Sequence, residues 1–224
     1  MRARIQSILT NFDAVGEDLL ALSDDIWLNI DHNDNEAVAE GARFKLAFNE
    51  QVDEFQQVAA RLSTLVADFT KVPSFDAPDA PGSTEERERR ERIIRSLDQG
   101  EPHGLNEDFR YKRPAVFTVG GLPFDGTNTW SQVYETRCRQ LATLKLPVFD
   151  ALPDNPDFTS RKHNKYFSRQ AGDLRVPRDF GRGVLAETNL SANQIRDNIR
   201  LLLETFGLEA SSFSVYLRED RDAA

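Results

Sequence analysis

The feature that most constrains the fold is an apolar pattern that repeats every three or four residues in the first third of the chain. Its members are Phe48, Val52, Phe55, Ala59, Leu62, Val66 and Phe69. Spacings that alternate between four and three put all seven side chains on one face of an α-helix about three heptads long. Because an exposed apolar face is unfavourable in water, this helix requires a second apolar surface that covers it.

A partner helix is available earlier in the chain. A shorter apolar stripe runs through Ile5, Leu9, Phe12 and, beyond a glycine, Leu19. Residues 24–34 are rich in Asp and Asn, which is typical of a short corner, and the longer helix is expected to start near Asn35. The sequence therefore predicts an antiparallel helical hairpin over residues 1–72. Because one hairpin buries only one seam, we expect it to form a homo-oligomer, for instance two hairpins joined in a dimer.

A proline-rich connector separates this hairpin from the rest of the chain. Residues 73–83 contain three prolines and a glycine, so they cannot continue a helix and are expected to form a linker. The segment 84–107 follows a capping box at Ser83–Glu86 and carries Glu/Arg pairs four residues apart. This pattern predicts a charged helical spacer on the surface.

The segment 108–219 carries the signals of a small α+β domain. Short strands are expected at 115–119, 122–124, 183–189 and 213–217, the first two joined by the turn Gly120-Gly121. Helices are expected at 130–144 and from the capping box Ser191–Gln194 to Gly207. The predicted fold class is thus α+β, with an N-terminal all-α hairpin or coiled-coil unit followed by a domain of about four short strands.

Signatures of an enzyme are scarce. The single cysteine, Cys138, excludes an intramolecular disulfide and a Cys-rich zinc site. It falls on the apolar face of the helix expected at 130–144, which predicts a buried and unreactive thiol. The three histidines are far apart in the sequence: His32, His103 and His163. No phosphate-binding loop or hydrolase motif occurs. We therefore expect no enzymatic activity, nuclease activity included, and no cofactor or metal.

The sequence also carries no signal for a membrane. It has no window of about 18 apolar residues, and its N-terminus lacks the apolar core of a signal peptide. With a single cysteine, this composition predicts a reducing compartment. We expect a cytoplasmic protein of bacterial type with no membrane partner.

The net charge of −9 is divided unevenly along the chain. Residues 1–107 carry 11 Lys/Arg against 22 Asp/Glu, whereas residues 108–219 carry 16 against 13. Between Phe158 and Arg182 the basic residues are Arg161, Lys162, Lys165, Arg169, Arg175, Arg178 and Arg182. Because a local patch governs the encounter with a polyanion more than the total charge does, these residues are predicted to contact DNA phosphates. Such a surface requires that the acidic half be held at a distance.

The order of motifs in the second half resembles a known DNA-binding family. A helix with Trp130 and Tyr134 is followed by the run from Arg161 to Ser168 (RKHNKYFS), by Leu174-x-x-Pro177, and by a strand that closes with Thr188-Asn189. Between Trp130 and Phe206 this order resembles the C-terminal DNA-binding domain of the SeqA family of bacterial replication-sequestration proteins. It also resembles a module at the C-termini of uncharacterised bacterial proteins.

The resemblance implies that the Thr-Asn loop, here Thr188 and Asn189, meets the base edges of DNA. It also implies DNA contacts from the residues before the Tyr-Phe pair, where Asn164 departs from the arginine of the family. An asparagine offers a donor and an acceptor that match adenine, and Asn193 is expected near base edges as well. As an alternative, Asn189 is a turn asparagine that satisfies backbone groups near a helix start. Tyr166 and Phe167 are expected in the core rather than stacked on bases.

Two hypotheses of different class follow. The first is a non-enzymatic, self-associating DNA-binding protein that uses its basic α+β domain to hold duplex DNA. The second is a protein-interaction or regulatory subunit of a bacterial phage-defence or restriction assembly, in which the hairpin is a scaffold and the α+β domain binds a partner protein. The overall acidity favours the second hypothesis, because it weakens non-specific binding to DNA.

Overall fold

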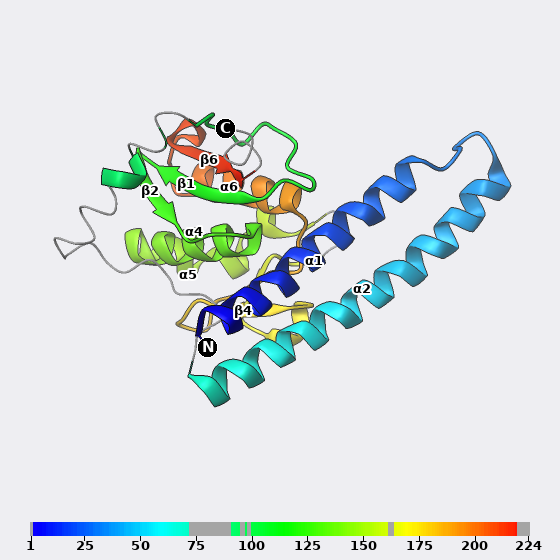
Figure 1. The fold of residues 1–224 in the computed structure, drawn as a ribbon, viewed down its shortest axis with the longest axis horizontal. Helices are drawn as coiled ribbons and strands as arrows, with labels where there is room; N and C mark the ends of the chain where they lie inside the picture. Colours follow the sequence, from blue (N-terminus) through cyan, green and yellow to red (C-terminus); the bar gives the residue numbers. More distant parts are fainter. Residues whose placement is uncertain (1, 72–90, 95–96, 98–99, 161–163, 219–224) are drawn as a thin grey trace.

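The computed structural model describes residues 2–71, 91–94, 97, 100–160 and 164–218. A long hairpin of two helices lies against a small α+β module, and the tip of the hairpin projects beyond that module (Figure 1). The predicted fold class, an all-α unit followed by a small α+β domain, is confirmed. Within the described residues no helix combines the length and the apolar character needed to span a bilayer.

The hairpin consists of α1 (Arg2–Leu28) and α2 (Asn35–Thr70). The α2 start is the expected one, because the Asp34 side chain accepts hydrogen bonds from the backbone N–H groups of Glu36 and Ala37. The helix α1 runs through Gly16 and ends at Leu28, within the corner expected at 24–34, so that corner is shorter than expected. A Cβ atom at Gly16 would lie 2.0 Å from Nε2 of Gln56. The glycine therefore permits close approach of the helices instead of breaking α1.

The expected seam on α2 is only partly buried. Val52 and Ala59 are buried, but Leu62 and Phe69 are exposed, and Phe69 is 88% exposed. Polar contacts also join the two helices: Ser23 Oγ donates to Asn49 Oδ1 at 2.9 Å. The face of α2 that meets α1 is thus rotated away from the predicted one, and several large apolar side chains remain uncovered.

The module contains two three-stranded antiparallel sheets. The first has the order β2 (Leu122–Asp125), β1 (Pro114–Val119), β6 (Phe213–Leu217). The second has the order β3 (Phe167–Ser168), β5 (Leu185–Glu187), β4 (Pro177–Asp179). The described residues thus form six strands instead of about four, because strands of two or three residues are too short to show an alternating pattern.

Helices fill the space beside these sheets. The α-helices are α4 (Trp130–Leu144), α5 (Leu146–Asp150) and α6 (Ala192–Thr205). Single 3-10 turns are η1 (Leu152–Asp154), η2 (Pro156–Phe158), η3 (Ala171–Asp173) and η4 (Ala210–Ser212). The capping box at the start of α6 is confirmed, since the Ser191 side chain and the Gln194 side chain bond each other's backbone. Gly120 and Gly121 have positive φ angles of 56° and 78°, as the turn between β1 and β2 requires.

The core of the module is aromatic. Trp130, Tyr134, Phe117 and Phe167 are fully buried, and the Trp130 Nε1–H donates to the Lys112 carbonyl at 2.9 Å. Phe167 is therefore a core residue as expected, whereas Tyr166 is half-buried. Burial raises the pKa of the Cys138 thiol far above its usual value, which agrees with the predicted unreactive cysteine.

The module starts earlier than the sequence indicated. The backbone N–H and carbonyl of His103 bond those of Val215 at 2.8 and 2.9 Å, and Leu105 belongs to the core. Residues 103 and 105, which the sequence placed in the spacer that ends at residue 107, thus pack on β6 and the core of the module. The linker at 73–83 and the capping box of the predicted spacer lie outside the described residues, whereas residues 91–94 are helical.

Candidate functional site

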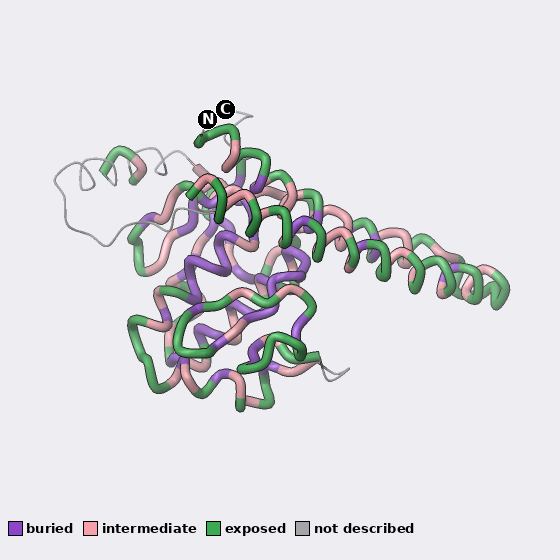
Figure 2. Tube along the Cα trace, turned by 90° about the horizontal axis from the view of Figure 1, so that it is seen from below, coloured by how far each residue is buried: buried purple, intermediate pink, exposed green. Residues whose placement is uncertain are grey.

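The hairpin and the module are packed together, with the module on one side of the hairpin (Figure 2). Three polar side chains of the module bind carboxylates of α1. Arg113 Nη1 lies 3.3 Å from Glu17 Oε2, Arg110 Nη1 lies 2.6 Å from Asp25 Oδ1, and the Tyr111 hydroxyl donates to Asp25 Oδ2 at 2.8 Å. The expectation that the acidic half is held at a distance from the module is therefore wrong. The charges of the two halves attract each other and are paired in their interface.

Two residues predicted to contact DNA meet at a carboxylate of α2. Asp53 Oδ1 accepts a hydrogen bond from Asn189 Nδ2 at 2.8 Å and lies 3.4 Å from Arg175 Nη1. Arg175 Nη2 also donates to the Asn189 carbonyl at 2.9 Å. We call these two residues the Arg175–Asn189 pair. It presents a guanidinium and a carboxamide N–H to one anionic oxygen atom.

A buried glutamate holds the backbone of this pair in place. Glu187 accepts hydrogen bonds from the backbone N–H groups of Arg175 at 2.6 Å, Val176 at 3.1 Å and Asn189 at 2.7 Å. Asn189 is fully buried, and within the described residues its Oδ1 atom has no hydrogen-bond partner. The backbones of Arg175 and Asn189 are thus held in place. The Asn189 side chain, with its acceptor atom Oδ1, is covered by α2.

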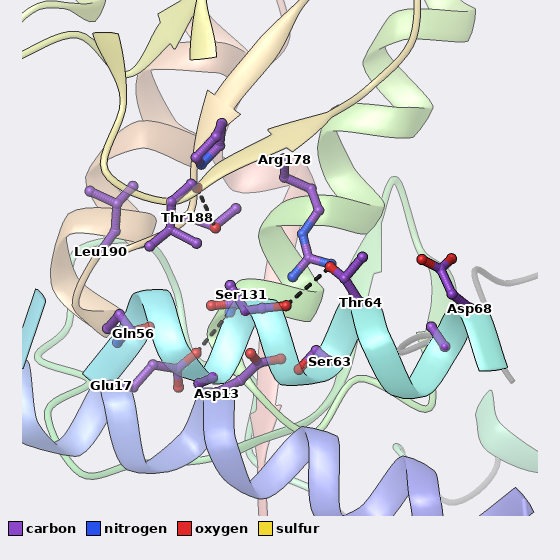
Figure 3. Close-up of a pocket in the computed structure, with 15 residues that line it drawn as sticks. Asp13, Glu17, Gln56, Ser63, Thr64, Asp68, Ser131, Arg178, Thr188 and Leu190 are labelled. Carbon is purple, nitrogen blue, oxygen red and sulfur yellow. Dashed lines mark hydrogen bonds between the residues drawn. The ribbon is translucent and has the colours of Figure 1, made fainter. Parts of the chain in front are cut away.

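A cavity of about 230 Å³ lies beside the pair, between the hairpin and the module (Figure 3). Asp13 and Glu17 reach it from α1, and Arg178 and Thr188 reach it from the module. The α2 side is lined mainly by small and polar side chains: Gln56, Ala59, Ala60, Ser63, Thr64, Ala67 and Asp68. Because many of these α2 side chains are small, they leave a space open between the hairpin and the module.

Burial shifts the pKa values of Asp13 and Glu17, the two α1 carboxylates that line the cavity. Burial raises the pKa of Glu17 to about 7, opposed by the Ser131 N–H, which donates to Glu17 Oε1 at 2.8 Å, and by Arg113. Burial likewise raises the pKa of Asp13 to about 6, opposed by the nearby charge of Arg178. The interface between the halves therefore contains two carboxyl groups that change charge near neutral pH.

The other residues predicted to contact phosphate are distributed over separate places on the module. Lys165 Nζ lies 2.8 Å from Asp173 Oδ2, and Arg178 Nε lies 3.8 Å from Glu135 Oε2. Arg169 and Arg182 meet at Asp150, the first on its carbonyl at 2.6 Å and the second 3.2 Å from its Oδ2. Arg161 and Lys162 lie outside the described residues.

The remaining candidates for base contacts are also bonded within the chain. The Thr188 hydroxyl donates to the Val176 carbonyl at 2.8 Å. Asn193 Oδ1 accepts from the Phe109 N–H at 2.9 Å, and its Nδ2 donates to Asp108 Oδ1 at 2.9 Å. In this conformation, Thr188, Asn189 and Asn193 do not form one open surface.

The acidic residues of this site are not among those that the sequence predicts as functional. Asp13 and Glu17 are four residues apart on α1, where one turn of helix aligns them, and Glu17 lies next to the glycine that meets α2. This pair of charged residues, aligned on one side of α1 beside a glycine, was the sequence signal that could have located the site. Nothing in the sequence around Asp53 distinguishes it from the other acidic residues of α2. In the described ranges, no group of three or more His, Cys, Asp or Glu side chains is arranged to hold a metal ion.

Comparison with known proteins does not identify the chain: no protein-family model, curated protein or solved structure matches it. Its function therefore has to be inferred from the site itself.

Proposed function

We propose that the protein is a non-enzymatic DNA-binding protein in which the Arg175–Asn189 pair contacts the duplex and Asp53 occupies that pair in the absence of DNA. One observation carries the proposal: the pair directs two N–H donors at a single carboxylate oxygen. Oriented donors on a guanidinium and an amide are also what a phosphate oxygen or a base edge accepts. The resemblance of the module to the SeqA family supports the same loop as the DNA contact.

The ion pair between Asp53 and Arg175 is weak enough for DNA to replace it, whereas the buried Asn189 becomes available to DNA only when α2 separates from the module. The Arg175 and Asp53 side chains are 41% and 36% exposed. An exposed ion pair of this kind contributes about 0–1 kcal/mol. Duplex DNA, by contrast, offers about one negative charge per 1.7 Å of its axis. Lys165, Arg169 and Arg182 are also solvent-accessible and would add phosphate contacts once the duplex is bound.

The test compares two variants of α2 in their binding to a duplex of about 20 base pairs, measured by fluorescence anisotropy. Asp53→Asn removes the competing carboxylate and is expected to raise the affinity about fivefold, since about 1 kcal/mol corresponds to that factor. Glu54→Gln is the matched control, because Glu54 is an exposed neighbour with the same charge. It is expected to leave the affinity near the wild-type value.

A variant of the module tests the other side of the contact. Arg175→Ala should weaken binding and reduce the slope of log K against log salt by about one, as expected for the loss of one phosphate contact. The absence of binding by both the wild type and Asp53→Asn at about 50 mM salt would contradict the proposal.

A second candidate is the protein-interaction or regulatory subunit of a phage-defence or restriction assembly. It is favoured by the pairing of most of the module's arginines with carboxylates of the same chain and by the uncovered apolar side chains of the hairpin. Purification from the native host distinguishes the two. A stoichiometric protein partner without nucleic acid supports this candidate, and co-purifying nucleic acid supports DNA binding.

A further inference from the structure

The hairpin carries a second apolar face that no described residue covers. On α1 its members are spaced seven residues apart. On α2 four members fall three or four residues apart near the end of the helix, and the fifth, Phe44, lies fourteen residues before them. We call this set the outer face: Ile8, Val15, Leu22, Phe44, Val58, Leu62, Leu65 and Phe69. All eight side chains are at least 40% exposed.

The outer face lies on the side of the hairpin away from the module. On α1, Val15 lies roughly 150° around the helix from Thr10 and Glu17, which bond the module, at 100° per residue. Asp18 and Asp25, which also bond the module, lie at the edge of the outer face, roughly 60° from Leu22 or less. On α2, Asp53 bonds the module, and Leu62 and Phe69 lie roughly half a turn from it. Figure 2 shows the module on one side of the hairpin only. No described part of the module therefore lies over the outer face.

This face is large for a protein surface left in contact with water. From Phe44 to Phe69 it is about 38 Å long, at 1.5 Å per residue, and two helices make it about 20 Å wide. The footprint of the two helices over this length, polar side chains included, is on the order of 700 Å². It is close to the roughly 800 Å² that each partner of a stable complex buries.

We propose that a second copy of the chain covers the outer face, with the two hairpins antiparallel in a four-helix bundle. The spacing of seven residues is the repeat by which helices pack in bundles, and a second hairpin offers a cover of equal length and the same spacing. In this arrangement a two-fold axis perpendicular to the helices places α1 on α1 and α2 on α2. The inference is independent of DNA binding.

The charges of the hairpin determine the antiparallel direction. Residues 5–42 contain Asp and Glu but no Lys or Arg, so the tip is acidic, with Asp31, Asp34, Glu36 and Glu40. The opposite end carries the basic residues Arg2, Arg4 and Lys71. An antiparallel dimer brings the basic end of each hairpin toward the acidic side of the other, whereas a parallel dimer places two acidic tips together.

The oligomeric state of the full chain tests the inference by light scattering after size exclusion. The wild type is expected at twice the chain mass of 25.4 kDa. Val15→Glu and Leu62→Glu each place a charge in the interface and should raise the dimer dissociation constant at least about 100-fold. The matched control is Leu46→Glu, because Leu46 is 72% exposed on α2 but lies outside the outer face. It should remain dimeric.

Two results would overturn the proposal. One is a wild-type chain that stays monomeric up to about 100 µM, which would leave the face to a different protein. The other is an equal loss of dimer in Leu46→Glu and in the two outer-face variants. Circular dichroism of each variant shows that helix content is retained, as expected for exposed positions.

Cysteine crosslinking tests the direction of the hairpins. Phe44 and Phe69 mark the two ends of the outer face on α2, and the native Cys138 is buried and does not compete. When Phe44→Cys and Phe69→Cys chains are mixed and oxidised, the mixed disulfide should exceed both self-crosslinked products. A preference for self-crosslinked Phe44→Cys chains would refute the antiparallel arrangement.

Discussion

At the scale of single residues, Glu17 is the least exposed of the carboxylates Glu17, Asp18, Asp25 and Asp53, which pair with arginines of the module. It binds Arg113 and the Ser131 N–H while only 4% of the residue is exposed. Its ordinary pKa is 4.5, and burial raises it to about 7. Between these values the folded chain holds a proton that the unfolded chain has lost. Glu17 therefore reduces the free energy of unfolding as the pH rises from about 4 to about 7.

The variant Glu17→Gln tests this pH dependence. Because glutamine does not ionise, the variant should lose about 2–3 kcal/mol less of its unfolding free energy than the wild type between pH 5 and pH 8. Urea denaturation at the two pH values measures the difference. Asp18→Asn is the control, since Asp18 also faces Arg113 but is half-exposed, and it should keep the wild-type profile. Parallel profiles for Glu17→Gln and the wild type would contradict the assignment.

Arg137 presents the opposite case, a buried cation to which no described carboxylate binds. It is 3% exposed, and among the described residues its Nε and Nη2 atoms have no hydrogen-bond partner. Burial lowers its pKa to about 10. Its Nη1 donates to Gln140 Oε1 at 3.1 Å. An unpaired buried charge opposes folding, and methionine has a similar shape without the charge.

Arg137→Met is therefore expected to raise the free energy of unfolding by about 1–3 kcal/mol. Chemical denaturation gives the value directly. The comparison variant is Arg139→Met, two residues along α4, where the guanidinium binds Glu135 and lies over the Phe180 ring. This second substitution should destabilise the chain, and the prediction for Arg137 fails if both variants are less stable than the wild type.

At the scale of elements, local signals define where helices start and turns form. The α6 capping box is formed by Ser191 and Gln194, which lie three positions apart in the sequence. Its loss in Ser191→Ala should cost about 1 kcal/mol and lower the melting temperature by about 2–4 °C. Differential scanning calorimetry measures the change. Ser211→Ala replaces an exposed serine near the chain's last strand and should melt with the wild type; an equal shift in both variants would refute the role of the cap.

How α1 and α2 pack against each other depends on residues that are far apart in the sequence. The helix pattern on α2 predicts an apolar face but not which part of that face meets α1. Gly16 and Ser23 on α1 determine the answer, because Gly16 permits close approach and Ser23 bonds Asn49. The contact line therefore passes through small and polar residues, and Leu62 and Phe69 are left on the outer face.

At the scale of the whole molecule, the hairpin has two different faces and two proposed tasks. One face pairs its carboxylates with the module at Arg113, Arg110 and Arg175. The other face is apolar and is the proposed contact with a second copy. In such a dimer, two modules would share one scaffold, so that DNA contacts too weak to act singly would add through effective concentration.

Much of the fold follows from the sequence, because helix caps, glycine turns and heptad spacing depend on residues that are close together in the chain. These signals locate α2, α4, α6 and the β1–β2 hairpin. They also place Phe167 and Cys138 in the core. The strands β3 and β4 escaped prediction, because two or three residues carry no measurable alternation.

Whether the Arg175–Asn189 pair is open or occupied by a carboxylate depended on the tertiary structure alone. Asn189 and Asp53 are 136 residues apart, and Arg175 and Asp53 are 122 residues apart. No local pattern records that these groups meet, since the contact arises only when the hairpin packs on the module. The sequence by itself determined which side chains can bind an anion. Only the packing of the two halves decided that a carboxylate of the same chain occupies them, because opposite charges brought together by folding pair with each other.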